Sequence, residues 1–430
     1  MSSDESRLGH TSIGQQPYEY VIVGGGIHGT CITNYLLTEG DFTRDEIRIV
    51  EPCKELLASF ETKAEQCGMK TLRSTFVQHI DTEPFSLESF AEEDNREHDL
   101  VSTESYPNRP TLDLFVDHAR YVIDRRGIDD CHLRSRVTGL TEREGRETLH
   151  VRTDVEPLEA RRVVLAIGLG AQPAVPEWTT ALPADEPFAH VWDTDFNPKT
   201  AATFDGETYV VGGGITAGQL ACRLSRKTDV TLLSRHKLEI ELTEADPYWL
   251  NWRHIEQEIH TLPPGSKARL DRIRAARNDG TIPPYLKRRL DEACNRGDLD
   301  MRRGEITSAV TTDDGLLVWF DDGTTAADVQ VVLATGLDPV PEHPLVRTVA
   351  ESLSLERGAG GFPTLDDQTL AWQQTDGTNS NVYVSGALAE PSVGPFARNI
   401  VGARRVAERL LASQNSAETE SASSVPKGRS

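Results

Sequence analysis

Apolar runs alternate with polar, helically spaced stretches along the chain from about residue 18 to residue 411. The run YEYVIV at 18–23 predicts a buried strand, and the glycine turn GGGIHG leads from it into a helical segment, TCITNYLL, at 30–37. A second apolar run, IRIVEP at 47–52, predicts the next strand. A strand, a helix and a second strand in this order are typical of the βαβ unit of a parallel sheet.

The same order recurs later in the chain. The strand ETYVV at 207–211, the turn GGGITAG, the helix QLACRLSRK and the strand VTLLSR repeat the first unit. Each unit is followed by a predicted meander, with strands HLRSRVTGLTER, ETLHVRTDV and ARRVVLAIGLG in 132–170 and strands MRRGEITSAVTTDD, GLLVWFDDG and DVQVVLATG in 301–336. A last strand, NVYVSGAL at 381–388, and a last helix follow the second copy.

The first glycine turn has the spacing of a dinucleotide-binding motif. In Gly24-x-Gly26-x-x-Gly29 the first glycine permits a tight turn, the second lets the backbone approach a pyrophosphate, and the third lets the helix pack closely on the strand. Glu51 ends the next strand, where a carboxylate can accept hydrogen bonds from both ribose hydroxyls and repels a 2′-phosphate. The first site is therefore predicted to bind FAD or NAD, not NADP.

The second glycine turn, at 212–218, is one residue longer before its last glycine. The strand after it ends in Ser234, Arg235 and Lys237 rather than in an acid, and these groups can hold a 2′-phosphate. This favours NADPH over NADH at the second site. The alternative is that Arg235 and Lys237 form a merely solvated basic turn.

Two nucleotide sites on one chain indicate electron transfer between two cofactors. The last strand and helix follow the second copy but would have no partner there, so they belong with the first domain. We predict an α/β fold with two Rossmann-like dinucleotide-binding domains, the NAD(P) domain being inserted into the FAD domain. The predicted limits are 17–171 and 337–412 for the FAD domain and 172–336 for the NAD(P) domain, with loose ends at 1–16 and 413–430.

The chain is acidic, with 68 Asp and Glu against 45 Lys and Arg and a formal net charge of -23. This charge argues against a nucleic-acid partner, and because concentrated salt screens such self-repulsion, we expect a halophilic source. A merely acidic enzyme is the alternative. The N-terminus lacks the pattern of a secretion signal and no segment is apolar for long enough to span a membrane, so a cytoplasmic location is expected.

The cysteines are scattered, with no C-x-x-C pair, so we expect them to be reduced and buried and to form no metal site. They are Cys31, Cys53, Cys67, Cys131, Cys222 and Cys294.

On these motifs the chain resembles flavoproteins with two dinucleotide-binding domains and, among them, the flavin-dependent monooxygenases that include the lysine and ornithine N-hydroxylases. The segment Gly68–Glu93 resembles the one that lies over the flavin ring, Tyr106–Asp124 is similar to the helix that follows it, and Val137 resembles the position whose backbone meets adenine. The resemblance implies that four residues lie near the flavin: Met69, Leu72, Arg73 and Ser74.

Three further positions follow from this resemblance. The phrase PFAHVWDTDF places His190 at the fingerprint histidine of the flavin monooxygenases, although the residues before it depart from the family spacing. His190 is the one catalytic candidate, and a satisfied surface or linker histidine is the alternative. The closing strand has Gly386 followed by Ala387 where the family usually has Gly-Asp, a departure that the N-hydroxylases share. Gly394 and Pro395 are expected to begin the last helix, whose N-terminus would stabilise negative charge on the flavin.

The residues predicted to contact the cofactors are Gly24, Gly25, Gly26, Ile27, His28, Gly29, Glu51, Met69, Leu72, Arg73, Val137, Gly168, Gly212, Gly214, Thr216, Gly218, Ser234, Arg235, Lys237, Gly336, Gly386, Gly394 and Pro395.

The resemblance implies an oxidoreductase in which NADPH, or NADH, reduces FAD and one oxygen atom of dioxygen passes to a small amine-type substrate. The alternative is a pyridine-nucleotide oxidoreductase that passes electrons to a quinone, ferredoxin or other acceptor without oxygen insertion. Disulfide reductases share the architecture but need a redox cysteine pair, and a flavin-binding protein without catalysis would not need the second site. Two segments outside the repeats, 52–125 and 243–298, are expected to determine the substrate.

Overall fold

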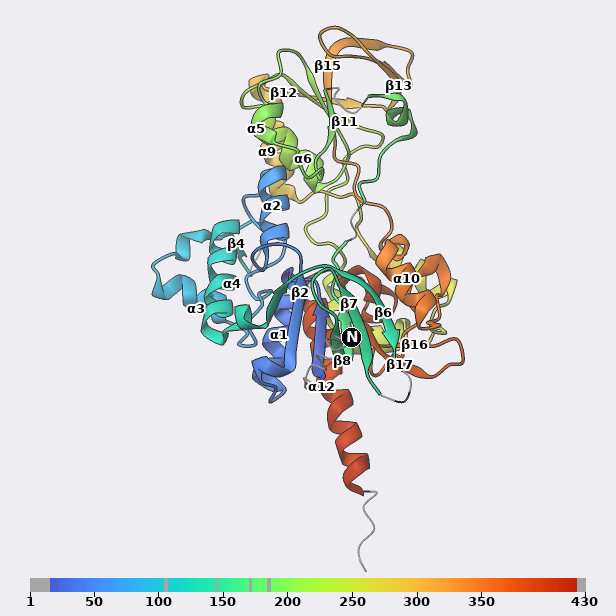
Figure 1. The fold of residues 1–430 in the computed structure, drawn as a ribbon. Helices are drawn as coiled ribbons and strands as arrows, with labels where there is room; N and C mark the ends of the chain where they lie inside the picture. Colours follow the sequence, from blue (N-terminus) through green and yellow to red (C-terminus); the bar gives the residue numbers. More distant parts are fainter. Residues whose placement is uncertain are drawn as a thin grey trace, which may run out of the picture.

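The protein folds into two lobes. The computed structural model describes residues 16–103, 107–143, 145, 147–169, 172–183 and 187–423. Three parts of the segments predicted above lie outside the described residues. They are positions 1–15 of the predicted loose N-terminus, Tyr106 of the predicted helical segment, and positions 424–430 of the predicted tail. Figure 1 shows the middle of the chain in the upper lobe and the first and last described elements, β1 (Tyr18–Val23) and α12 (Ile400–Ser423), in the lower lobe.

An eight-stranded sheet forms the centre of the lower lobe. Its strands are β1 (Tyr18–Val23), β2 (Ile47–Glu51), β5 (His132–Arg134), β6 (Val137–Glu142), β7 (Leu149–Thr153), β8 (Leu158–Leu165), β16 (Ala371–Gln373) and β17 (Asn379–Val384). The order is β16-β17-β8-β1-β2-β5, and β7 joins β8 to β6. Strands β17, β8, β1, β2 and β5 run parallel, and β1 at their centre is almost completely buried, which explains its unbroken apolar run.

A seven-stranded sheet forms the upper lobe. Its strands are β9 (Phe188–His190), β10 (Thr208–Val211), β11 (Val230–Ser234), β12 (Leu299–Arg303), β13 (Ile306–Thr311), β14 (Leu316–Phe320) and β15 (Thr325–Leu333). The order is β12-β11-β10-β15-β14-β13, with β9 on β15. Because strands of the first sheet come from both sides of this segment, the predicted α/β fold with one dinucleotide-binding domain inserted into the other is confirmed. The exact domain limits stay a prediction.

Helices cover both sheets. The α-helices are α1 (Ile27–Glu39), α2 (Ala58–Cys67), α3 (Ser86–Glu93), α4 (Leu112–Arg126), α5 (Pro198–Ala201), α6 (Ile215–Leu224), α7 (Trp252–Glu258), α8 (Lys267–Ala276), α9 (Pro284–Arg296), α10 (Pro344–Ser352), α11 (Glu390–Val393) and α12 (Ile400–Ser423). Short 3₁₀ helices lie at Arg44–Glu46, Glu97–Asp99, Ile128–Cys131, Glu177–Ala181, Pro247–Leu250, Val340–Glu342, Ala359–Gly361 and Gly386–Ala389, and a small ribbon pairs β3 (Leu100–Val101) with β4 (Arg109–Pro110). In Figure 1, α2 lies at the waist between the lobes.

Two predicted strands are each divided in the structure. The run at 132–143 forms β5 and β6, and the run at 301–314 forms β12 and β13. β5 pairs in parallel with β2, whereas β6 pairs antiparallel with β7, and β12 and β13 differ in the same way. One straight strand cannot join both partners, so the chain turns between them.

The stretch from the 3₁₀ helix at 247–250 to the end of α8 leaves the upper lobe and packs on the lower one. Its apolar residues, among them Trp249 and Ile255, form a cluster with Phe396. The buried Arg405 of α12 donates from Nη2 to the carbonyl oxygens of Trp249 at 2.9 Å and Leu250 at 2.7 Å. Part of the segment assigned by sequence to the NAD(P) domain therefore rests on the first domain.

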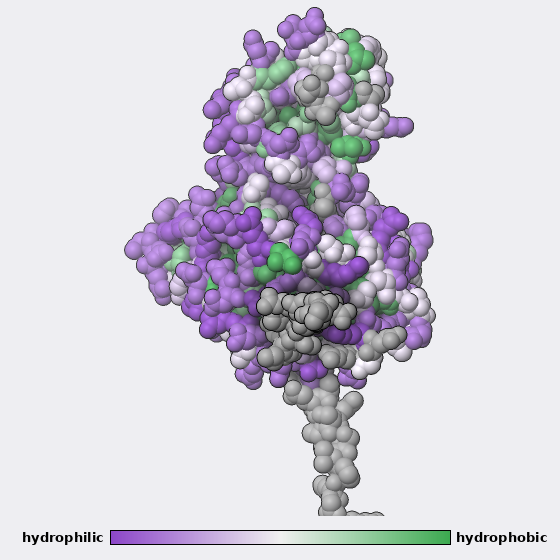
Figure 2. Space-filling view, viewed as in Figure 1, coloured by the Kyte–Doolittle hydropathy of each residue, from purple (hydrophilic) through white to green (hydrophobic). Residues whose placement is uncertain are grey.

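The last helix extends into the predicted tail. α12 continues to Ser423, past the point at 413 where the sequence predicts a loose end, and Figure 1 shows it leaving the lower lobe. Hydrophilic residues dominate the face of both lobes drawn in Figure 2. Within the described residues, no helix has the length and apolar character needed to cross a bilayer.

All six cysteines are free. Four of them are buried as predicted, whereas Cys53 and Cys294 are half-buried.

Candidate functional site

The first glycine turn joins β1 to α1 in a conformation that depends on its glycines. Gly24 has a φ of 111°, and a Cβ there would lie 2.5 Å from the Ala166 carbonyl oxygen. A Cβ on Gly29 would lie 1.9 Å from the Gly24 carbonyl oxygen, whereas one on Gly26 would meet nothing within 4 Å. No side chain caps the N-terminus of α1. The open space at Gly26 and the uncapped N–H groups fit a pyrophosphate.

Glu51 lies beside this turn at the end of β2. Its carboxylate is 9% exposed and accepts hydrogen bonds from the backbone N–H of Gly25 at 2.8 Å and of Cys53 at 2.9 Å. These contacts fix both oxygens while leaving lone pairs for a ligand. The carboxylate predicted from spacing to meet a ribose is thus held rigidly next to the turn. Val137, predicted to lie near adenine, begins β6 and is buried.

His28 connects this turn to the closing strand. Its Nε2 lies 3.2 Å from the Arg398 carbonyl oxygen, which can only accept, so Nε2 carries the proton and Nδ1 accepts from the Ser385 hydroxyl at 2.8 Å. Burial lowers the pKa of His28 to about 4, and the ring is therefore neutral. A Cβ on Gly386 would lie 3.8 Å from this ring and 3.9 Å from the Gly168 carbonyl oxygen, so these predicted positions lie together.

The second glycine turn repeats the first with one difference. A Cβ on Gly212 would lie 2.5 Å from the Ala334 carbonyl oxygen, and Gly214 precedes α6 without a side-chain cap. The last glycine, Gly218, faces α9, where a Cβ would approach Leu286 to 3.1 Å. The extra residue therefore lets α6 pack closely on a helix.

The corner after β11 carries the groups predicted to hold a 2′-phosphate. Arg235 and Lys237 are exposed and form no ion pair with any described residue. The Ser234 hydroxyl donates to the His236 carbonyl oxygen at 2.9 Å. Two neighbouring cations without ion-pair partners among the described residues fit a phosphate dianion.

A cleft of about 1160 Å³ lies between the lobes and brings many predicted residues together. Those that line it are Ile27, His28, Met69, Leu72, Arg73, Ser74, Gly212, Gly214, Thr216, Ser234, Arg235, Lys237 and Gly336. The predicted residues outside this lining are Gly24, Gly25, Gly26, Gly29, Glu51, Val137, Gly168, His190, Gly218, Gly386, Gly394 and Pro395. The cleft therefore meets both glycine turns at their helix ends.

The segment predicted to cover the flavin is fixed on both sides. The N–H of Leu72 donates to the Pro110 carbonyl oxygen at 3.1 Å, and that of Leu112 donates to the Lys70 carbonyl oxygen at 3.0 Å. The Arg73 guanidinium crosses to the second domain, where it donates to the carbonyl oxygen of Thr243 and to the Thr281 hydroxyl, both at 2.9 Å. Arg73 thus links the segment predicted to cover the flavin to the other wall of the cleft.

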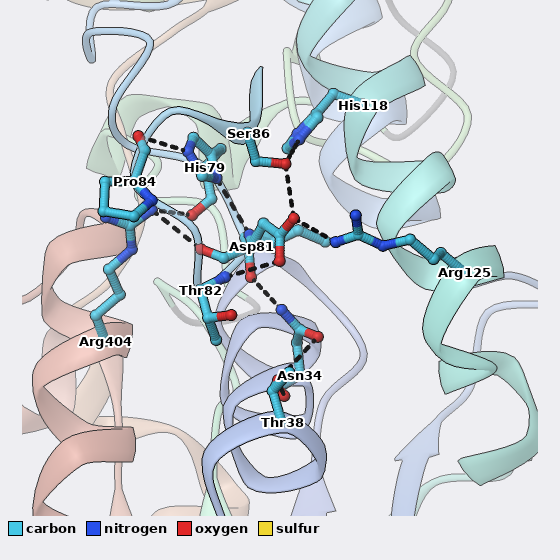
Figure 3. Close-up of polar contacts among 11 residues, drawn as sticks. Asn34, Thr38, His79, Asp81, Thr82, Pro84, Ser86, His118, Arg125 and Arg404 are labelled. Atoms are coloured by element: carbon cyan, nitrogen blue, oxygen red, sulfur yellow. Dashed lines mark hydrogen bonds and ion pairs between the residues drawn. The ribbon is translucent and has the colours of Figure 1, made fainter. Parts of the chain in front are cut away.

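A buried polar network anchors the loop that continues from this cover (Figure 3). The Ser86 hydroxyl donates to Asp81 at 2.6 Å and lies 2.9 Å from Nε2 of His118, which therefore donates to it. Arg125 pairs with the same carboxylate at 2.5 Å. Although burial works against it, the Ser86 hydrogen bond and the Arg125 charge lower the pKa of Asp81.

The last helix begins later than the sequence predicts. α12 starts at Ile400, so the expectation that Gly394 and Pro395 begin it is wrong. Gly394 follows α11 with a φ of 97°, and a Cβ there would lie 2.4 Å from Ile255 of α7. The turn is therefore set by contact with a distant segment.

The start of α12 lines the cleft through three residues that sequence reasoning missed: Arg398, Asn399 and Ile400. The local signal for this start is Asn399, because asparagine is favoured directly before the first helical turn.

His190 lies at the end of β9 and is only 1% exposed. Its Nδ1 accepts a hydrogen bond from the Trp192 backbone N–H at 3.1 Å, and the backbone N–H of His190 donates to the Asp193 carboxylate at 2.6 Å. Burial lowers the pKa of the His190 ring. The charge of Asp193 and a hydrogen bond with the Gly336 backbone offset part of this lowering. These contacts give His190 a place in the packing of the second domain, so it is not a surface histidine, and its catalytic role stays a prediction.

Charged residues that the sequence did not single out line the cleft beside Arg73. Arg277 pairs with Asp279 at 2.8 Å and with the buried Glu390 at 3.0 Å. Arg398 pairs with the other oxygen of Glu390 at 2.9 Å. Glu244, by contrast, is half-buried and its carboxylate has no ion pair with any described residue. A cationic or hydrogen-bond-donating ligand group would complete it.

Comparisons with known proteins agree with this geometry. The model of a family described as FAD-NAD(P)-binding matches residues 21–170. A search of curated protein sequences finds no match to the chain. The ornithine N-hydroxylase of Kutzneria sp. 744 is 18% identical with a TM-score of 0.74, and the alignment covers 94% of this chain and 100% of that chain. L-lysine 6-monooxygenase from Pseudomonas syringae is 20% identical with a TM-score of 0.70, covering 93% and 99%. Ornithine hydroxylase from Pseudomonas aeruginosa is 17% identical with a TM-score of 0.72, covering 93% and 98%.

The fold and the cleft define an architecture with two dinucleotide-binding domains, and the first domain matches the family model described as FAD-NAD(P)-binding. Within this class the chain is similar in fold to the ornithine and lysine N-hydroxylases, as the sequence resemblance predicts.

Proposed function

We propose that the chain is an FAD- and NADPH-dependent monooxygenase that hydroxylates a small amine-type substrate. One observation carries the proposal: a single cleft is lined by the helix end of each glycine turn and by the flavin-covering segment. A nicotinamide and a flavin held by these two turns would meet in that cleft, which is what hydride transfer between them requires. Bound FAD, reduced by NADPH, supplies the activation of dioxygen.

The residues of the chain bind and orient the two cofactors. Glu51 would accept hydrogen bonds from the ribose of FAD, and the uncapped start of α1 would receive its pyrophosphate. At the other end of the cleft, Arg235 and Lys237 would bind the 2′-phosphate of NADPH. The segment predicted to lie over the flavin, which Arg73 links to the second domain, would keep water from the reacting centre.

The amine assignment rests on Glu244. Glu244 is half-buried, and although the charges of Arg73 and Arg277 act on its carboxylate, no described residue forms an ion pair with it, so a partner in direct contact would stabilise it. A protonated amine of the substrate would fill this role. The similar structures, whose names specify ornithine, lysine and cadaverine as substrates, point the same way.

The test is to reconstitute the protein with FAD and supply NADPH, dioxygen and a panel of diamines and amino acids, including those three. We expect one oxygen atom from labelled dioxygen in the amine product, seen by mass spectrometry, with NADPH oxidation coupled to it. Oxygen-independent NADPH oxidation with a quinone or ferredoxin, and only peroxide in air with every amine, would identify a simple reductase instead.

The Glu244→Gln variant tests the amine site separately from the reaction type. It keeps the size of the side chain and removes its charge, so we expect KM for the amine to rise about tenfold or more with little change in KM for NADPH. Glu241→Gln, whose side chain does not line the cleft, is the matched control. Equal KM values in the two variants would remove the amine assignment and leave the oxygen chemistry intact.

A further inference from the structure

Two extended segments, 239–245 and 277–282, connect the second domain to the stretch that packs on the first domain. We call them the linking pair, because backbone hydrogen bonds join one segment to the other. In one of these bonds the Asn278 N–H donates to the Glu244 carbonyl oxygen at 2.9 Å. Glu244, the carboxylate of the proposed amine site, therefore belongs to the linking pair.

The Arg73 side chain reaches the linking pair from the segment predicted to cover the flavin. Its Nη2 donates to the carbonyl oxygens of Glu241 and Thr243 and to the Thr281 hydroxyl, at 2.6, 2.9 and 2.9 Å, and its Nε donates to the Leu242 carbonyl oxygen at 3.2 Å. Three of these acceptors are consecutive backbone carbonyl oxygens. Because a guanidinium is planar and its donors have fixed directions, these contacts restrain the backbone of both segments.

Contacts on both sides of this link are fixed in turn. The buried Arg109 donates from Nε to the Arg73 carbonyl oxygen at 2.9 Å, which holds the Arg73 backbone in the first domain. On the other side, the residues that Arg73 binds directly precede Glu244 in the chain. No described residue forms an ion pair with the Glu244 carboxylate, so the backbone determines where this carboxylate lies.

The charge of Arg73 and its hydrogen bonds would affect a bound amine in opposite directions. Burial lowers the pKa of Arg73, and the charge of Glu244 counteracts part of this effect, so the guanidinium lies in the field of that carboxylate. The positive charge of Arg73 alone would repel a protonated amine at Glu244 and weaken its binding. The hydrogen bonds of Arg73, by contrast, hold Glu244 in one place before the amine arrives, which strengthens binding.

We propose that Arg73 is a positioning residue for the amine site, because it fixes the backbone that carries Glu244 to the segment predicted to cover the flavin. This inference rests on the proposed function, since it takes Glu244 as the partner of the amine. The position of the bound amine relative to the flavin is then set by the first domain, although Glu244 belongs by sequence to the second.

Amide hydrogen exchange of the full-length, FAD-loaded protein tests this positioning without any amine. The amides of Glu241, Asn278 and Ile282 donate within the linking pair and report on its opening. In Arg73→Gln we expect peptides that cover the linking pair to exchange at least about tenfold faster than in the unmodified protein. Unchanged exchange would overturn the proposal.

Arg357→Gln is the matched control for this measurement. The Arg357 guanidinium also donates to backbone carbonyl oxygens, those of Pro341 at 2.9 Å and Gly361 at 3.1 Å, but it does not line the cleft. Exchange in the linking pair should be the same in this variant as in the unmodified protein. Equal acceleration in both variants would indicate a general loss of stability and would also overturn the proposal.

Calorimetric titration of the FAD-loaded protein with cadaverine, L-lysine and L-ornithine tests the consequence for the amine. We expect Arg73→Gln to weaken amine binding by about tenfold or more, but by less than about twofold when Glu244 is already replaced by Gln. Arg73→Lys keeps the charge and loses the planar set of donors, so its loss of affinity should be intermediate.

The outcomes of this titration separate the role of Arg73 from the proposed function. Equal losses of affinity with and without Glu244 would mean that Arg73 contacts the amine itself. Tighter binding in Arg73→Gln would mean that only its charge acts on the amine. Either result would overturn the positioning role and leave the amine site in place. If the unmodified protein bound none of the three amines, the amine part of the proposed function would fail, and this role of Arg73 with it.

Discussion

The backbone N–H of Gly25 donates a 2.8 Å hydrogen bond to Oε2 of Glu51, which joins the first glycine turn to the end of the neighbouring strand. The same carboxylate accepts from the Cys53 N–H. Glu51 therefore has two roles: it supports the turn from the side, and it presents lone pairs where the ribose of FAD is predicted to lie.

Replacing Glu51 by Gln should weaken FAD binding. The amide keeps one oxygen for Gly25 but puts an NH₂ group where the other oxygen accepted, so a donor faces the Cys53 N–H. We expect a loss of about 1–3 kcal/mol of FAD binding, a factor of about five to about 150. Flavin content per protein after gel filtration, and FAD titration of the stripped protein, measure it.

The matched control is Glu55→Gln, which changes an exposed glutamate four residues further along. It should keep the flavin content of the unmodified protein. Unchanged FAD affinity in Glu51→Gln would show that the first site is misassigned.

The glycines of the first turn should separate cofactor binding from folding. A Cβ on Gly26 meets nothing within 4 Å, so Gly26→Asp should fold, but its charge at the start of α1 would repel the pyrophosphate and lower flavin content at least tenfold. A Cβ on Gly29 would lie 1.9 Å from a carbonyl oxygen. Gly29→Ala should therefore lower the melting temperature of the protein freed of FAD, whereas Gly26→Asp should leave it close to its original value. The opposite ranking in thermal unfolding would contradict this reading of the turn.

The contrast between these glycines indicates what the sequence could predict. Gly24, Gly26, Gly29 and Glu51 belong to a pattern confined to one βαβ unit, and because the local chain geometry fixes their positions, the spacing alone placed them. The same holds for the second turn and for the α/β fold, since each strand and helix carries its own periodicity.

The remainder of the cleft depends on contacts between distant segments. Pro395 suggested a helix start because proline favours the first helical position, yet Gly394 is packed against Ile255 and the helix begins at Ile400. Glu244 reaches the cleft because its segment folds back onto the lower lobe, where the buried Arg405 holds the neighbouring backbone. No local pattern of residues encodes a contact across more than a hundred positions.

The second nucleotide corner should determine the choice between NADPH and NADH. Arg235 is exposed, lines the cleft and has no ion pair with any described residue, so its loss should remove a phosphate contact without harm to the fold. We expect Arg235→Ala to lower kcat/KM for NADPH by about ten- to a hundredfold and to leave that for NADH within a factor of about two. Stopped-flow flavin reduction with each nucleotide measures the preference.

Lys199→Ala is the control for this change, because it removes a cation of the same domain that does not line the cleft. It should keep the NADPH preference. If Arg235→Ala also keeps it, the residues after β11 do not bind a 2′-phosphate.

The buried histidines in Figure 3 should make the protein sensitive to mild acid. Burial lowers the pKa of His79 to about 3 and that of His118 to about 4, from an ordinary value of 6.5. In the unfolded chain both rings bind protons below pH 6.5, whereas the folded protein keeps them neutral. Their contribution to stability is therefore complete above about pH 6.5 and is lost progressively toward pH 4, by roughly 2 kcal/mol per ring at pH 5.

The measurement is the free energy of unfolding between pH 7.5 and pH 5 at constant salt. Replacing His118 by Gln leaves a side-chain amide that can donate to the Ser86 hydroxyl but cannot titrate, so we expect this variant to lose less stability on acidification than the unmodified protein. His98→Gln removes an exposed histidine and should keep the original slope. If the stability of His118→Gln and of the unmodified protein fell equally with pH, His118 would bind a proton as readily in the folded protein as in the unfolded chain. The network around Asp81 would then open more readily than its burial indicates.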